Sequence, residues 1–251
     1  HWFQIDPQLV NEIWSAFYPG MIEQATERAL WGARITNDDW GTHPTMAYAA
    51  MISAAFFEDD IEELVKLAVD AVPNTGPFAE GIRDVIRWHE QHDDWRVTRQ
   101  LIHDKYWAYK STELEAPVSI VSSLYNGLTG IMALLYGEGE YTKTVGIATS
   151  AGYDSDNQAA TLGGLIGVMR GMTGLSAHVV TRMKTLDASW EWEEPFNDTY
   201  VNISRDEIAL RTPITEIAAR IVAIAEQAIR DNGGRMIHKN GEIYYVINSD
   251  I

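Results

Sequence analysis

Apolar residues recur three and four positions apart along most of the 251 residues of this chain. That spacing places apolar side chains on one face of an α-helix, whereas a half-buried β-strand requires alternation. Helix-ending signals such as Pro19-Gly20 and Val72-Pro73 separate the periodic runs. The sequence therefore predicts an all-α bundle, with helices near residues 9–18, 21–34, 43–57, 60–72, 78–92, 95–107, 118–136, 140–151, 158–171 and 213–232.

The end of the chain follows a different pattern. Residues 236–247 alternate around Asn240-Gly241, a dipeptide typical of tight β-hairpin turns. We therefore expect one helical domain over residues 1–232 and a β-hairpin extension over residues 233–251. Residues 187–205 contain Trp190 and Trp192 without a clear period, so we expect them to be irregular.

Three glycines share one face of a predicted helix. Gly163, Gly167 and Gly171 are spaced four apart. Residues at that spacing lie above one another on a helix, and small side chains let a neighbouring backbone approach. We expect this face to pack tightly against another helix.

Composition excludes several classes of function. The formal net charge is −17, with no Lys/Arg-rich run, which disfavours binding to nucleic acids and to anionic membranes. The chain has no cysteine, which excludes thiolate nucleophiles and Cys-based metal sites. No apolar run approaches the roughly 20 residues of a membrane span, and residues 1–6 do not resemble a signal peptide. We expect a soluble, cytoplasmic protein.

The clearest candidate for chemistry is a group of oxygen-bearing side chains before an apolar helix. Asp154, Asp156 and Asn157 supply the ligand types that Mg²⁺, Mn²⁺ and Ca²⁺ prefer, rather than those of zinc. An EF-hand is excluded, because Ala159 and Leu165 stand where that loop needs glycine and glutamate. On spacing alone, the three residues can equally cap the helix and complement its dipole.

Other polar groups favour structural interpretations. His89 and His92 are three apart near a predicted helix end, where the helix dipole favours positive charge. The zinc-protease motif needs one more intervening residue. Asp38 and Asp39 are interpreted as solvated acids of a loop.

The sequence around the acidic pair resembles the signature of the ADP-ribosylglycohydrolase family. The resemblance rests on the run Leu135-Tyr136-Gly137-Glu138-Gly139-Glu140 and on residues 148–152, 154–161 and 163–167. Upstream, Trp40-Gly41-Thr42-His43, with Met46 and residues 49–51 and 54–56, is similar to the substrate-side loop and central helix of that family. Residues 193–201 resemble its C-terminal region, so the likeness covers roughly residues 5–230.

This resemblance implies hydrolysis of an N- or O-glycosidic bond between ADP-ribose and a protein or small-molecule acceptor. It implies that Asp154 and Asp156 are catalytic. It also implies that they ligate a pair of Mg²⁺ or Mn²⁺ ions together with Asn157, which replaces the usual Thr or Ser. Contact with the substrate is implied for Trp40, Gly41, Thr42, His43, Gly152 and Tyr153.

One part of the family pattern has no counterpart here. The family carries a Thr or Ser followed by Asp-Asp near its beginning. Residues 36–39 read Thr-Asn-Asp-Asp, but they fall where the family places its substrate loop. We therefore expect a preceding segment or a partner chain to complete the metal site. The alternative function is a non-catalytic, ligand-binding or structural member of the family.

Overall fold

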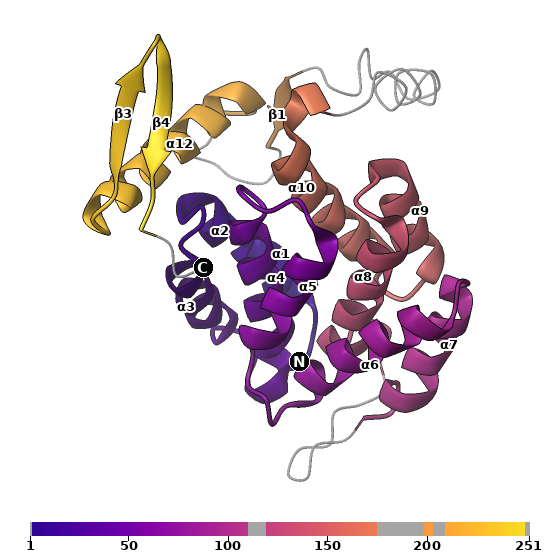
Figure 1. Ribbon diagram of the computed structural model, residues 1–251. Coiled ribbons are helices and arrows are strands. Elements are labelled where there is room, and N and C mark those ends of the chain that lie inside the picture. Colours follow the sequence, from indigo (N-terminus) through magenta and orange to yellow (C-terminus); the bar gives the residue numbers. More distant parts are fainter. Residues whose placement is uncertain (1, 110–118, 175–197, 203–208, 249–251) are drawn as a thin grey trace. The chain divides into compact units, whose positions relative to one another are not determined.

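The computed structural model describes residues 2–109, 119–174, 198–202 and 209–248. Residues up to 169 form one compact unit, and residues 170–248 form a second (Figure 1). Because both strands of the last hairpin fall within 170–248, the hairpin groups with the helix that precedes it. The predicted division at residue 232 stays a prediction.

The first unit consists mainly of helices, the last of which extends beyond residue 169, so the prediction of an all-α fold is confirmed. Among the helices that the structure describes, none is long and apolar enough to cross a bilayer. The elements are α1 (Asp6–Asn11), α2 (Ile13–Phe17), α3 (Ile22–Ala33), the 3₁₀ helix η1 (Asp39–Thr42), α4 (His43–Ala54), α5 (Ile61–Asp70), α6 (Pro77–Gln91), α7 (Trp95–Tyr106), α8 (Ser123–Gly137), α9 (Tyr141–Ala151) and α10 (Ser155–Gly174).

Local signals explain where several helices begin. Asp60 accepts hydrogen bonds from the backbone N–H groups of Glu62 and Glu63, which caps α5 as the sequence predicts. Asp94 caps α7 in the same way, and Pro77 occupies the first turn of α6. These contacts satisfy N–H groups that lack a partner within the helix.

Helix α8 starts later than expected, at Ser123 rather than near residue 118. The backbone N–H of Ser123 donates to Phe3 O (2.7 Å), and the N–H of Ile5 donates to Val121 O (2.9 Å). Residues 121–123 therefore pair with the N-terminal segment in extended form, a long-range contact that helical periodicity cannot reveal.

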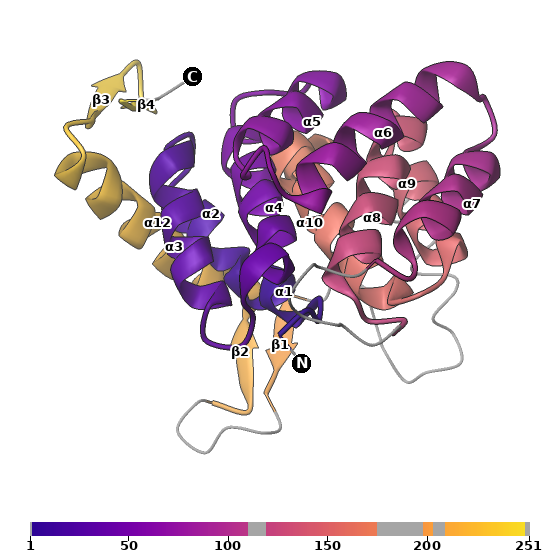
Figure 2. The ribbon, with the colours of Figure 1, turned by 90° about the horizontal axis from the view of Figure 1, so that it is seen from below.

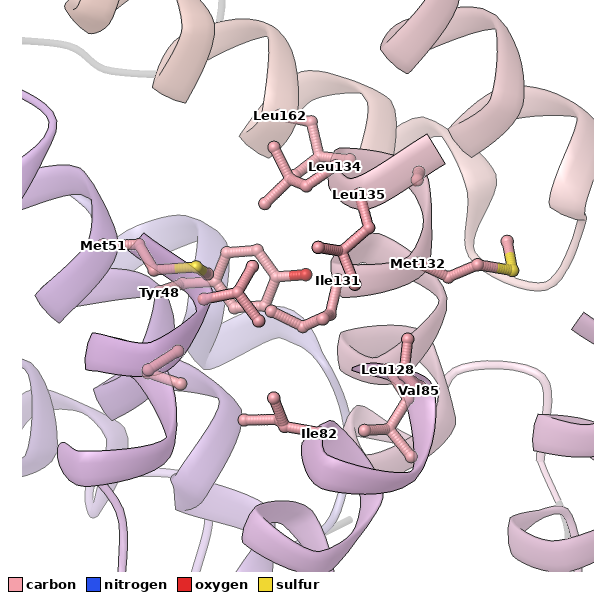
Figure 3. Packing of buried hydrophobic residues seen from close by; sticks show 14 of the residues in the cluster. Tyr48, Met51, Ile82, Val85, Leu128, Ile131, Met132, Leu134, Leu135 and Leu162 are labelled. Carbon is pink, nitrogen blue, oxygen red and sulfur yellow. The ribbon is translucent and has the colours of Figure 1, made fainter. Parts of the chain in front are cut away.

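Helix α8 lies at the centre of this unit. All its residues are buried, and α6, α7 and α9 pack beside it (Figures 1 and 2). Figure 3 shows Leu128, Ile131 and Leu135 of α8 in the same cluster as Tyr48 of α4 and Leu162 of α10. Burying such a side chain stabilises a fold by about 1.5–3 kcal/mol. Packing around α8 therefore fixes the helices that carry the candidate site.

The closest helix approach lies on α8 and not on the predicted glycine face of α10. A Cβ added to Gly130 would lie 2.0 Å from Tyr48 Oη and 2.4 Å from Gln158 Oε1. On α10, a Cβ at Gly163 would make only ordinary contacts, with Tyr141 at 3.6 Å and Val145 at 3.8 Å, and one at Gly167 meets no described atom within 4 Å. The expectation of tight packing at Gly167 is therefore wrong, because that part of the helix is half-exposed.

After the end of α10, the described residues of the second unit form two short hairpins and the helix α12. Strand β1 (Thr199–Val201) pairs antiparallel with β2 (Arg211–Pro213), and α12 spans Ile214–Asp231. Strand β3 (Arg235–Lys239) pairs with β4 (Glu242–Val246) through Asn240 and Gly241, both at positive φ, so the predicted C-terminal hairpin is confirmed. Residues 199–201 form a strand where irregular structure was expected. Trp190, Trp192 and residues 193–197 lie outside the described residues.

Replacing Gly130 with Ala should destabilise the protein by about 1–3 kcal/mol, because the new methyl group overlaps Tyr48 and Gln158. Gly146 of α9 is the matched control, since its Cβ would meet no atom within 4 Å. Gly146→Ala should instead stabilise by up to about 1 kcal/mol through helix propensity. Urea unfolding of both variants measures the contrast, and equal effects would contradict the close approach.

Candidate functional site

The loop between α9 and α10 turns the chain sharply before the acidic pair. Gly152 has φ 82° and ψ −155°, a conformation that only glycine adopts easily, and Tyr153 has φ 62°. The backbone N–H of Asp154 then donates to Asn126 Oδ1 (3.0 Å). Asn126 is fully buried in α8, and its amide nitrogen donates to Ile120 O and Ser122 O. The start of α10 is therefore attached to the central helix.

Asp154 and Asp156 occupy different positions at this helix start. The carboxylate of Asp154 accepts a hydrogen bond from the backbone N–H of Asn157, which makes it the N-cap, and it also lies within hydrogen-bonding reach of the Asp156 side chain. Asp156 is exposed in the first turn. The sequence left capping and metal binding as alternatives; the structure shows the capping bond, and metal binding by Asp154 stays a prediction.

Burial, as the largest cause, and the neighbouring carboxylate of Asp156 together raise the pKa of Asp154 to about 6. Asp6, in the first turn of α1, adds a smaller contribution of the same sign. The local charge is thus strongly negative, and a cation placed among these groups would lower the energy of their ionised forms.

Asn157 contributes a further oxygen to this site. Its side chain is 4% exposed, and its Oδ1 atom has no hydrogen-bond partner. A buried carbonyl oxygen without a partner is energetically costly, and a bound cation or a water molecule would satisfy it. Asp154, Asp156 and Asn157 therefore fit a hard divalent cation by donor type. Over the described ranges, no group of three His, Asp or Glu side chains is arranged to hold a metal.

A buried polar network lies farther along α10. Thr161 donates to the carboxylate of Glu12, at the junction of α1 and α2, and accepts from Gln8 Nε2 (3.1 Å). Burial raises the pKa of Glu12 to about 7, although the Thr161 hydrogen bond opposes the shift. Sequence reasoning missed this network, because Glu12 and Thr161 are 149 positions apart and Glu12 belongs to no recognisable motif.

Residues 40–43, the predicted loop, form part of η1 and the first residue of α4, and they are largely enclosed by protein. Trp40 is 3% exposed, and its ring contacts Trp2 and Tyr109 edge-on, with centroids 4.9 and 5.8 Å apart. A Cβ at Gly41 would lie 2.2 Å from Trp2 O, so only glycine fits there. Two buried nitrogens of this loop, Trp40 Nε1 and His43 Nδ1, have no hydrogen-bond partner. Burial lowers the pKa of His43 and so favours its neutral ring.

The N-terminal segment connects this loop with the acidic pair. Asp38 N–H donates to Trp2 O (3.1 Å), and Asn37 Nδ2 donates to Gln4 O (2.6 Å). The same segment pairs on its other side with residues 121–123, next to Asn126, which holds Asp154. The structure therefore joins the two predicted halves of the site through intervening residues. Contact of either half with a substrate stays a prediction.

His89 and His92 belong neither to the acidic pair nor to the segment around Trp40. They line a pocket of about 300 Å³ with Asp93, Trp95, Tyr136, Glu138, Lys143 and Ile147. His89 lies in the last turn of α6 and His92 directly after it, which agrees with the dipole interpretation.

Comparison with known proteins gives one match. The family model described as ADP-ribosylglycohydrolase matches residues 13–224, which includes the acidic pair and the Trp40 loop. No curated protein and no solved structure matches the chain.

The raised pKa of Glu12 predicts a stability that falls as pH rises. Between pH about 4.5 and about 7, the unfolded chain has released the Glu12 proton while the folded chain retains it. The free energy of unfolding should therefore decrease across this window, by up to about 3 kcal/mol once Glu12 is ionised in both states. Glu12→Gln should therefore be more stable than the wild type at pH 8 but not at pH 4. Urea unfolding at both values, with exposed Glu27→Gln as the control, tests this.

The two aspartates should respond oppositely to removal when no divalent cation is present. Asp154→Ala loses the cap of α10 and should cost about 1 kcal/mol. Asp156→Ala loses no capping bond and removes a repulsion, so its stability in chelator should match or exceed that of the wild type. Thermal unfolding in EDTA measures both, and an equal loss in the two variants would show that Asp156 also serves as a cap.

Proposed function

Since the chain belongs to the ADP-ribosylglycohydrolase family, a family of hydrolases, we propose that it cleaves an ADP-ribosyl bond in a metal-dependent reaction. The substrate is an ADP-ribosylated protein or a small ADP-ribosyl compound, and the bond is N- or O-glycosidic. Asp154, Asp156 and Asn157 are the residues that hold Mg²⁺ or Mn²⁺.

One observation carries this proposal. Two carboxylates lie within hydrogen-bonding reach of each other beside a buried amide oxygen that has no partner. A helix cap alone requires neither the second carboxylate nor the unpartnered Asn157 Oδ1. A divalent cation accounts for both, because it offsets the charge and satisfies the oxygen.

A cation at this position also suits an anionic substrate. With a formal net charge of −17, the protein repels a diphosphate unless positive charge is supplied locally. Two bound ions, as the family resemblance implies, would provide such charge. Because two carboxylates and one amide cannot fill the ligand shells of two ions, water, substrate oxygens or residues of another segment would complete them.

The chemistry assigned to these residues is a simple hydrolysis. Bound metal supplies orientation of the ribose hydroxyls and of the attacking water. Water oxygen bonds to the anomeric carbon, the glycosidic bond breaks, and the acceptor leaves with a proton. The carboxylates of Asp154 and Asp156 stabilise the positive charge that develops on the anomeric carbon. A carboxylate oxygen of this pair takes the proton that the water loses and passes it to the leaving acceptor, so that the carboxylate returns to its ionised form.

The proposal predicts that purified protein, freed of metal with EDTA, releases ADP-ribose from ADP-ribosyl-arginine or ADP-ribosyl-serine peptides only after Mg²⁺ or Mn²⁺ is added. Asp156→Ala should lower kcat/KM at least about 100-fold, because a ligand and a charge at the reacting centre are lost. Asp70→Ala, which removes an exposed acid at the end of α5, should leave kcat/KM unchanged.

Two other outcomes would favour the alternative functions. Metal-dependent binding of ADP-ribose without turnover on either peptide would indicate a ligand-binding member of the family. Turnover that appears only when a second protein segment is added would indicate a site completed in trans. Absence of both metal binding and ADP-ribose binding would overturn the assignment of Asp154, Asp156 and Asn157.

A further inference from the structure

A stripe of three side chains, two on α7 and one at its C-cap, contacts the residue that precedes Asp154. Arg99, His103 and Trp107 are four positions apart and therefore share one side of this stretch of chain. The Arg99 guanidinium carbon lies 4.4 Å from the centroid of the Tyr153 ring. His103 Nδ1 and Tyr153 Oη are hydrogen-bonded at 2.7 Å, and the Trp107 ring is stacked on that of Tyr153 at 5.6 Å.

Tyr153 needs such support because of its backbone conformation. Its φ of 62° lies in the left-handed region, which costs a non-glycine residue about 1–2 kcal/mol per residue. Gly152, beside it, is also at positive φ and adds flexibility to the turn. Contacts of the Tyr153 ring therefore oppose a change in the backbone conformation of this turn. They include the Tyr125 ring, whose centroid lies 4.7 Å from that of Tyr153.

Arg99 also binds the other side of the turn. Its Nε donates to Ala151 O (3.1 Å), the carbonyl at the end of α9. One side chain thus contacts the residue before Gly152 and the residue after it. Asp154 follows immediately, and its own N–H is held by Asn126 Oδ1. The direction in which the Asp154 carboxylate points depends on this turn.

We propose that Arg99 and His103 are positioning residues that act through Tyr153 to fix the Asp154 carboxylate for metal binding. The consequence for metal binding rests on the proposed function. The contacts of Arg99 and His103 with Tyr153 do not depend on it. Apolar side chains would suffice if the stripe only packed α7 against its neighbours. The oriented hydrogen bond and the stacked guanidinium instead restrict the ring in direction as well as in position.

The first measurement needs neither metal nor substrate. Hydrogen exchange of the Asp154 amide, followed by NMR in EDTA, reports how firmly the turn is held. Tyr153→Phe and His103→Phe each keep a ring and remove the Oη to Nδ1 bond, and Arg99→Leu removes the stacked cation. Exchange at Asp154 should accelerate at least about fivefold in each. The double variant Tyr153→Phe/His103→Phe should be no faster than either single one, because both break the same bond.

A matched control lies on the same helix. The guanidinium carbon of Arg96 also lies over an aromatic ring, 5.2 Å from the centroid of Trp95, and Arg96 forms an ion pair with Asp94. Among the residues that the structure describes, these partners of Arg96 include neither Gly152 nor Tyr153. Arg96→Leu should therefore leave Asp154 exchange unchanged. His103→Gln, which retains a hydrogen-bonding group near Tyr153 Oη, should restore part of the protection lost in His103→Phe.

The second measurement is the affinity for Mn²⁺, determined by electron paramagnetic resonance. Loss of a residue that orients a ligand typically weakens metal binding 10–100-fold, so the dissociation constant should rise about tenfold or more in Tyr153→Phe, His103→Phe and Arg99→Leu. Unchanged exchange at Asp154 in all three variants would overturn the inference, whatever the metal affinity. Unchanged Mn²⁺ affinity in variants whose exchange is faster would also overturn it.

These outcomes separate the inference from the proposed function. If the wild type binds no Mn²⁺, the metal assignment fails. Faster exchange of the Asp154 amide in the three variants would then still support the claim that α7 positions this residue. If the wild type binds Mn²⁺ and hydrolyses ADP-ribosyl peptides while the variants match it in exchange and affinity, the proposed function stands and the positioning role is wrong.

Discussion

The complete burial of α8 is the constraint on which the rest of the first unit depends. A helix without an exposed face must be covered on every side, and α4, α6, α7 and α9 contact it to do so. Its polar residues must then find partners inside the protein. Asn126 accepts a hydrogen bond from the backbone N–H of Asp154. The helix at the centre of the core therefore also positions the acidic pair.

Much of the fold could be predicted because it follows from local signals. Helical periodicity, the Asp60 cap and the Asn240-Gly241 turn each depend on residues close in the sequence. The late start of α8 could not be predicted from local signals, because residues 121–123 pair with the N-terminal segment. The spacing of glycines was also insufficient to predict where two helices approach each other closely. The close approach occurs at Gly130, where Tyr48 and Gln158 arrive from distant helices.

The candidate site shows the same division. The two aspartates and Asn157 were visible as a motif, and Asn126 could have been noticed as an amide within an apolar run. Glu12 and Asp6 carried no such signal, since their proximity to α10 is purely tertiary. Arg99 and His103 were equally hidden, because their spacing on α7 is that of any amphipathic helix. The sequence therefore revealed the candidate ligands, and it did not reveal the residues that contact them and their neighbours in the folded protein.

Asp154 serves as the cap of α10 and is held by Asn126, and both contacts are made between groups of the protein itself. If the loop binds a divalent cation as proposed, it would not need to become ordered on binding, because the entropy of that ordering is already lost in folding. Such a site would bind quickly and release its ion without local unfolding. Exchange of one divalent ion for another would then be governed by the water shell of the incoming ion rather than by motion of the protein.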